Sequence, residues 1–144
     1  MSLLEPLPPP WPGRMLAVLR VVAGLVFISA GTMKLFGYPH GPSPMPAVPL
    51  ISQAGLAGIL EAFGGLSIVL GLLTRPVAFV LAGEMAVAYF QFHFPRSFFP
   101  TANNGMPAVL YCFLFLYLTV AGAGAWSLDE RILRGKRSAV ALRA

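Results

Sequence analysis

Cysteine, histidine and charged residues are all scarce in this chain. Its 144 residues include one cysteine, Cys112, and two histidines, His40 and His93. A single cysteine allows neither an internal disulfide nor a Cys-x-x-Cys redox motif. The histidines have no third ligand at a useful spacing, so we predict no metal or haem site within the chain. These absences argue against a self-contained thiol oxidoreductase, and no catalytic residue can be named from the sequence.

The shortage of charge has a second consequence. Only 10% of the residues are charged and 57% are hydrophobic, whereas about 25% of a soluble domain is charged. The mean hydropathy is +0.76. A membrane-spanning helix needs about 20 mainly apolar residues, and runs of this kind cover about 14–37, 50–73, 76–94 and 106–125. The sequence therefore predicts an all-α integral membrane protein, a four-helix transmembrane bundle.

The few Lys and Arg residues are unevenly distributed. Both termini and the short turn at Thr74–Pro76 belong to one side, which holds Arg14, Arg75, Arg131, Arg134, Lys136, Arg137 and Arg143. The other side has Arg96 alone. The positive-inside rule then places both the N- and the C-terminus in the cytoplasm. We interpret the basic tail as a contact for anionic lipid rather than for nucleic acid; a solvated tail without a partner is the alternative.

Proline, glycine and tryptophan divide the chain into three parts. Residues 1–13 are Pro-rich, and we expect no helix before Pro12 has passed. Residues 14–126 form the transmembrane domain, and 127–144 form the basic tail, whose Ser127 starts a short capped helix. A signal peptide cleaved after Ser29-Ala30-Gly31 is a competing interpretation of the first run. We expect no cleavage, because the apolar run continues past that point.

Six of the polar residues within the apolar spans are candidates for a buried polar site, because a charge at mid-membrane costs roughly 3 kcal/mol on insertion scales. They are Arg20, Lys34, Glu61, Glu84, Gln91 and His93. From helical spacing and depth we predict a buried cluster of Arg20 with Glu61 and Glu84. One carboxyl of that cluster would be protonated, or Lys34 would balance it. Three roles stay open: a structural ion pair, a ligand or quinone pocket, and a proton path.

Small residues recur along the same spans at helical spacing. We assign helix packing to Gly24, Gly31, Ala54, Gly58, Ala62, Gly65, Ala78, Ala82 and Ala86. Rows of this kind let helix backbones approach closely. Glu61 lies beside one such row, so we expect it to face another helix rather than lipid. The rows also suggest a homo-oligomer or a hetero-complex.

Three segments in this order resemble the DoxX family of small four-helix membrane proteins. They read LRVVAGLVFISAGTMKLFG, ILEAFGGLSIVLGLLTRPVAF and FQFHFPRSFFP. The resemblance implies a bacterial inner-membrane protein that is an accessory or anchor subunit of a quinone-linked or redox-stress system, rather than an enzyme on its own. It would have a redox partner protein and no cofactor within the chain, with a quinone held by Arg20, Glu61 and His93. A non-enzymatic scaffold or small transporter is the alternative.

Overall fold

The computed structural model describes residues 8–41 and 46–141. Parts of the predicted Pro-rich N-terminal segment and of the external loop after residue 37 lie outside these ranges. Arg143 also lies outside them, as do the side chains of Lys136 and Arg137.

The described residues form helices that follow the four predicted spans and the tail. The first span is α1 (Trp11–Phe36), and the second is α2 (Gln53–Ile59), η1 (Leu60–Gly64) and α3 (Gly65–Leu70) in direct succession. The third is α4 (Thr74–Ala88), η2 (Tyr89–His93) and η3 (Phe94–Arg96). The fourth is α5 (Met106–Ala121), and the tail is α6 (Leu128–Ala141). Both η1 and η2 are π-helical turns, and η3 is a 3-10 turn.

Two helix ends differ from the predicted ones. Helix α1 begins at Trp11 instead of residue 14, because Pro12 occupies its first turn, where a missing N–H needs no partner. Helix α5 ends at Ala121, four residues before the predicted end at 125. The next residue, Gly122, has φ 85°, which glycine adopts without strain.

The spans have the length and composition of a membrane protein. Within the described residues, three helical stretches are long and apolar enough to cross a bilayer: Trp11–Phe36, Gln53–Leu70 and Thr74–Arg96. Helix α5 is apolar but shorter, at 16 residues. Large apolar side chains on the outside of the bundle are exposed, among them Val22, Leu25, Phe63, Phe79, Leu110 and Phe113. Such a surface suits lipid rather than water. The predicted all-α membrane bundle is confirmed.

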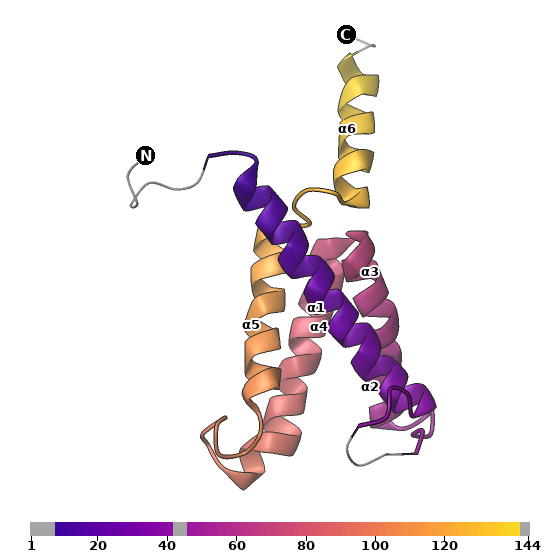
Figure 1. Ribbon diagram of the computed structural model, residues 1–144, viewed down its shortest axis with the longest axis vertical. Coiled ribbons are helices and arrows are strands. Elements are labelled where there is room, and N and C mark those ends of the chain that lie inside the picture. Colours follow the sequence, from indigo (N-terminus) through magenta and orange to yellow (C-terminus); the bar gives the residue numbers. More distant parts are fainter. Residues whose placement is uncertain (1–7, 42–45, 142–144) are drawn as a thin grey trace.

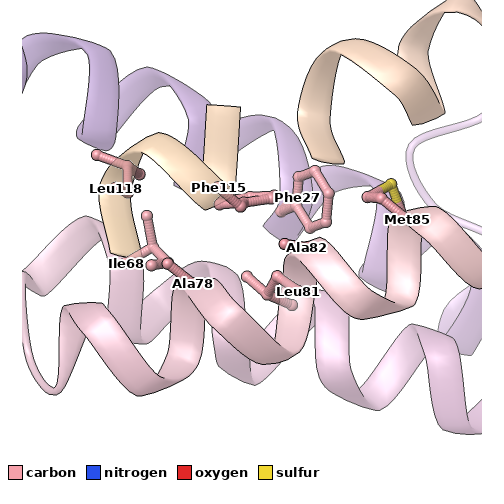
Figure 2. Packing of buried hydrophobic residues seen from close by; sticks show 8 residues of the cluster. All are labelled: Phe27, Ile68, Ala78, Leu81, Ala82, Met85, Phe115 and Leu118. Carbon is pink, nitrogen blue, oxygen red and sulfur yellow. The ribbon is translucent and has the colours of Figure 1, made fainter. Parts of the chain in front are cut away.

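The bundle combines two helix pairs around one core. Helix α1 packs along α2, η1 and α3, while α4 packs along α5. Figure 1 shows α6 beyond the end of the bundle at which α1 begins. The core is an apolar cluster from α1, α3, α4 and α5, shown in Figure 2: Phe27, Ile68, Ala78, Leu81, Ala82, Met85, Phe115 and Leu118. The rings of Phe27 and Phe115 meet edge to face, 4.6 Å between centroids.

Most of the small residues lie at contacts within this one chain. The backbone of Gly24 faces that of Gly65, and a Cβ at Gly24 would come within 2.7 Å of the Gly65 carbonyl oxygen. Two turns further along α1, Gly31 faces Gly58 and Ala62 in the same way. Ala78 and Ala82 are buried in the core, while Ala86 is half-buried and Ala54 is exposed. Because these rows are largely used inside the bundle, they give no argument for a homo-oligomer.

Candidate functional site

An ion pair joins the first and second spans. The Lys34 Nζ lies 2.5 Å from the Glu61 Oε1, and Glu61 is nearly fully buried. Lys34 is in the last turn of α1, and Glu61 is in the π-helical turn η1. Gly31, one turn before Lys34, lets α1 approach η1 closely enough for the two side chains to meet. Glu61 therefore faces a helix contact, and its partner is Lys34.

The carboxyl groups of Glu61 and Glu84 lie near this ion pair, and three of their four oxygens have no hydrogen-bond partner within the described part of the chain. The Glu61 Oε2 and both carboxylate oxygens of Glu84 are buried without a hydrogen-bond partner among the described residues. Glu84 comes from α4 and interacts electrostatically with Glu61 and Lys34. A buried polar group without a partner is costly, so these oxygens are available to accept hydrogen bonds from a group that enters beside them.

These side chains line one cavity between the second and third spans. Its volume is about 540 Å³, and Lys34, Gln53, Glu61, Glu84 and His93 supply its polar lining. The remaining lining is apolar, and several of its members are also exposed on the outside of the bundle: Leu56, Leu60, Val80, Val87 and Phe92. Since these residues lie within the spans, the cavity opens sideways toward the bilayer.

His93 lines the end of the cavity nearest the loop before α5 and is held by that loop. Its Nδ1 lies 3.0 Å from the backbone oxygen of Asn103. A carbonyl oxygen can only accept a hydrogen bond, so Nδ1 carries the proton and its N–H donates the hydrogen bond to Asn103. Asn103 is itself buried, and its side chain donates to the Ser97 oxygen and accepts from the Gly105 N–H. In the neutral ring Nε2 is then left as a hydrogen-bond acceptor.

The predicted pairing of Arg20 with Glu61 and Glu84 is wrong. Arg20 is fully buried, but its guanidinium donates to backbone oxygens, those of Ile68, Val69, Ala123 and Trp126. These carbonyls belong to the last turn of α3 and to the segment between α5 and α6. Arg20 thus fastens the end of the bundle nearest α6, away from the cavity, and the predicted part of Arg20 in a quinone pocket is corrected accordingly.

The structure brings four of the six predicted polar residues to the cavity. Lys34, Glu61, Glu84 and His93 line it, and Arg20 does not. Gln91 lies in η2 next to it and hydrogen-bonds to Gln53 at the start of α2. That bond ties the two spans together beside the end of the cavity at which α2 begins.

Sequence reasoning missed three residues that matter here. Gln53 is a cavity residue at a helix start, and Asn103 positions His93. The Asn103-Asn104-Gly105 turn was a signal for the second of these, because asparagine side chains bond the backbone nearby. Asp129 lies in the first turn of α6. It also accepts from the N–H groups of Leu73 and Thr74 and so ties α6 to the start of α4.

Within residues 8–41 and 46–141, no group of three or more His, Cys, Asp or Glu side chains could hold a metal ion. Cys112 is half-buried on α5 and packs against the apolar core. The side chains that line the cavity can form hydrogen bonds, compensate charge and bind protons.

Comparison with known proteins supports the resemblance noted above. The DoxX family profile matches residues 15–94. A Haemophilus influenzae protein named only as uncharacterized is 41% identical over 125 residues, 83% of this chain and 91% of the relative. The inner membrane protein YqjF of Escherichia coli is 34% identical over 83% of this chain and 92% of its own length.

A third relative is more distant. The uncharacterized membrane protein Rv3486 of Mycobacterium tuberculosis is 29% identical over 79% of this chain and 78% of its own length. The search of solved structures gave no significant match. With its apolar helices and these relatives, the protein is a multi-pass bacterial inner-membrane protein. The chain belongs to the DoxX family.

Proposed function

We propose that this protein is an accessory membrane subunit of a quinone-linked redox system, and that the cavity between the second and third spans receives the quinone head group. The observation that carries the proposal is the convergence of Lys34, Glu61, Glu84 and His93 on one otherwise apolar cavity. Ligand sites are commonly of this kind, with apolar walls and a few polar groups that fix orientation.

The size and the opening of the cavity suit a ligand dissolved in the membrane. A volume of about 540 Å³ lies within the range of roughly 300–1,000 Å³ typical of small-molecule sites. The exposed rim residues Leu60, Val80 and Val87 face the bilayer. A quinone could therefore enter sideways from the lipid and leave its isoprenoid tail outside.

The polar groups provide what the two forms of a quinone require. When bound, a quinone would accept or release two electrons and two protons. The Lys34 ammonium has donors beyond the one that meets Glu61, and it can donate to a quinone carbonyl oxygen. The Glu84 carboxylate can accept from a hydroquinone hydroxyl and hold its proton, as can the His93 Nε2. The unpartnered oxygens of Glu84 fit this acceptor role.

The electrons need a carrier outside this chain. The chain has one cysteine, and its described residues contain no cluster of metal ligands. We therefore assign no electron carrier to residues of this chain. The proposal therefore includes a redox-active partner protein. The cavity lies toward the end of the bundle that holds the loop before α5, opposite α6. By the positive-inside rule this is the outer face, where we expect the partner to dock.

A quinone-binding measurement tests the proposal. The protein in lipid nanodiscs is titrated with a short-chain ubiquinone and a short-chain naphthoquinone, and binding is followed calorimetrically. Val80→Trp fills the cavity without removing a polar group, whereas Phe79→Trp alters the neighbouring, lipid-facing residue. We expect saturable binding by the wild type and by F79W, and its loss in V80W. Equal binding by V80W and F79W, or none by the wild type, would refute the proposal.

A purely structural role for the buried charges is the second candidate. Arg20 favours it, because its hydrogen bonds to backbone oxygens fasten helix ends and use no ligand. The unpartnered carboxylate of Glu84 does not fit a fastening role. Glu84→Gln separates the two candidates. Under the proposal it weakens quinone binding while the protein stays folded, and under the structural candidate it changes stability alone.

A further inference from the structure

A second hollow lies at the end of the bundle opposite the cavity. It is a groove of about 700 Å³ between the first turn of α1 and the base of α6. Arg14, Glu130, Arg131 and Arg134 supply its charged lining, and Trp126 and prolines at the start of α1 complete it. Figure 1 shows these two elements at the same end of the molecule.

The walls of the groove are fixed to the bundle. The Asp129 carboxylate accepts from the N–H groups of Leu73 and Thr74 at 2.8 and 2.9 Å. The Ala125 N–H donates to the Gly13 oxygen at 3.0 Å, which joins the segment before α6 to the first turn of α1. The base of α6 is therefore tied to the start of α4, and the segment before it is tied to α1, so the groove is a preformed feature rather than a gap beside a loose tail.

The groove is positively charged overall. Three arginines line it against one carboxylate, that of Glu130, which pairs with Arg134 at 2.6 Å. Arg14 lies over the ring of Trp11, 5.5 Å from its centroid, and this contact holds its side chain in place. Arg131 is exposed. Arginine has the planar set of donors that matches a phosphate group.

The groove lies at the depth of the lipid head groups. Trp11 and Trp126, both exposed, stand beside the groove where tryptophan marks the membrane–water boundary. Below Arg14 on the same face of α1, one and two turns toward the bilayer, Val18 and Val22 are exposed apolar residues. A phosphate held in the groove would thus have an apolar strip beneath it for acyl chains.

We propose that this groove binds the phosphate of an anionic phospholipid in the cytoplasmic leaflet, through Arg14 and Arg131. Arg134 adds positive potential while it remains paired with Glu130. The ligand is a lipid rather than a soluble phosphate compound, because the apolar strip on α1 continues from the charged groove. This site is independent of the quinone cavity and rests on different residues.

The test is a titration of the full-length, delipidated protein with short-chain phosphatidylglycerol and, in parallel, with short-chain phosphatidylcholine. A cation near the membrane surface contributes about 1 kcal/mol toward anionic lipid, so the double substitution R14Q/R131Q should weaken phosphatidylglycerol binding by about ten- to thirtyfold. R75Q/R96Q removes the same charge elsewhere and should leave binding within about threefold of wild type. R14K/R131K keeps the charge and should retain most of the binding.

Each remaining outcome decides the proposal. Equal losses in R14Q/R131Q and R75Q/R96Q would reduce the effect to net charge and overturn the site. Displacement of phosphatidylglycerol by millimolar inorganic phosphate would also overturn it, because the ligand would then be soluble. If R14Q/R131Q does not fold, a charge-neutral change of the apolar strip, Val18→Ser, carries the test. The serine variant should weaken lipid binding without altering the arginines, and unchanged binding would contradict the proposal.

Discussion

Replacing Arg20 and Glu61 by glutamine, singly and together, tests whether the buried charges form one network or two. In the structure the Arg20 guanidinium donates to the Ile68 and Ala123 oxygens at 2.6 and 2.8 Å, while Glu61 meets Lys34. The two groups share no partner. Their substitutions should therefore have independent effects on the free energy of unfolding.

The magnitudes follow from burial and partners. Arg20 is fully buried and donates to four backbone oxygens. A hydrogen bond to a charged group contributes about 1.5–3 kcal/mol, so losing several of them should cost about 3 kcal/mol or more. The Lys34 side chain is 33% exposed, so its pair with Glu61 is partly screened. Losing a hydrogen bond to a charged group there should cost about 1.5–3 kcal/mol. For sites without shared partners, the double variant should equal the sum of the singles within about 0.5 kcal/mol.

Unfolding of the detergent-solubilised variants, followed by helical circular dichroism, measures these quantities. Arg75→Gln is the matched control, since Arg75 is exposed at the same end of the bundle as Arg20 and should change stability by less than about 0.5 kcal/mol. The pair Lys34→Gln with Glu61→Gln provides a positive control for coupling, which should reach about 1 kcal/mol or more. Coupling of that size between R20Q and E61Q would refute the separation of the two networks.

Two further predictions concern packing and the attachment of the tail. Gly31→Ala places a Cβ against the backbone of the second span and should destabilise the protein by about 1–3 kcal/mol. Gly83→Ala, with open space around it, should be neutral or stabilising. Thermal unfolding that ranks the two variants in the reverse order would contradict the packing. Asp129→Asn should weaken the contact between α6 and the start of α4, so limited proteolysis should cut this variant before α6 faster than it cuts the control variant Glu130→Gln. Equal cleavage rates in the two variants would show that Asp129 does not hold the tail.

Hydropathy and helical spacing predicted the spans and the direction in which Glu61 points. Each predicted run had about the 20 residues needed to cross a bilayer, although the fourth helix is shorter in the structure. Small residues beside Glu61 marked a close helix contact that the structure contains. The ends moved by a few residues, because a proline fits the first turn of a helix and a glycine with positive φ ends one.

The partners of the buried charges could not be predicted in the same way. Arg20 bonds to backbone oxygens, which every residue carries, so no side-chain pattern marks them. Glu61 lies in a π-helical turn, which holds more residues per turn and so rotates the side chains that follow it. Spacing rules for a regular helix miss that rotation. Opposite charges at matching depth were therefore a poor guide to which pair would meet.

Photo-crosslinking with an azido-quinone tests the central claim, that the cavity between the second and third spans binds a quinone. The protein in native-lipid nanodiscs is irradiated with the probe, and the modified peptides are mapped by mass spectrometry. The account predicts adducts at cavity-lining residues such as Leu60, Val80 and Phe92, with labelling suppressed by excess unlabelled quinone and absent in V80W. Labelling spread along the lipid-facing side of α5, unaffected by competitor, would contradict it.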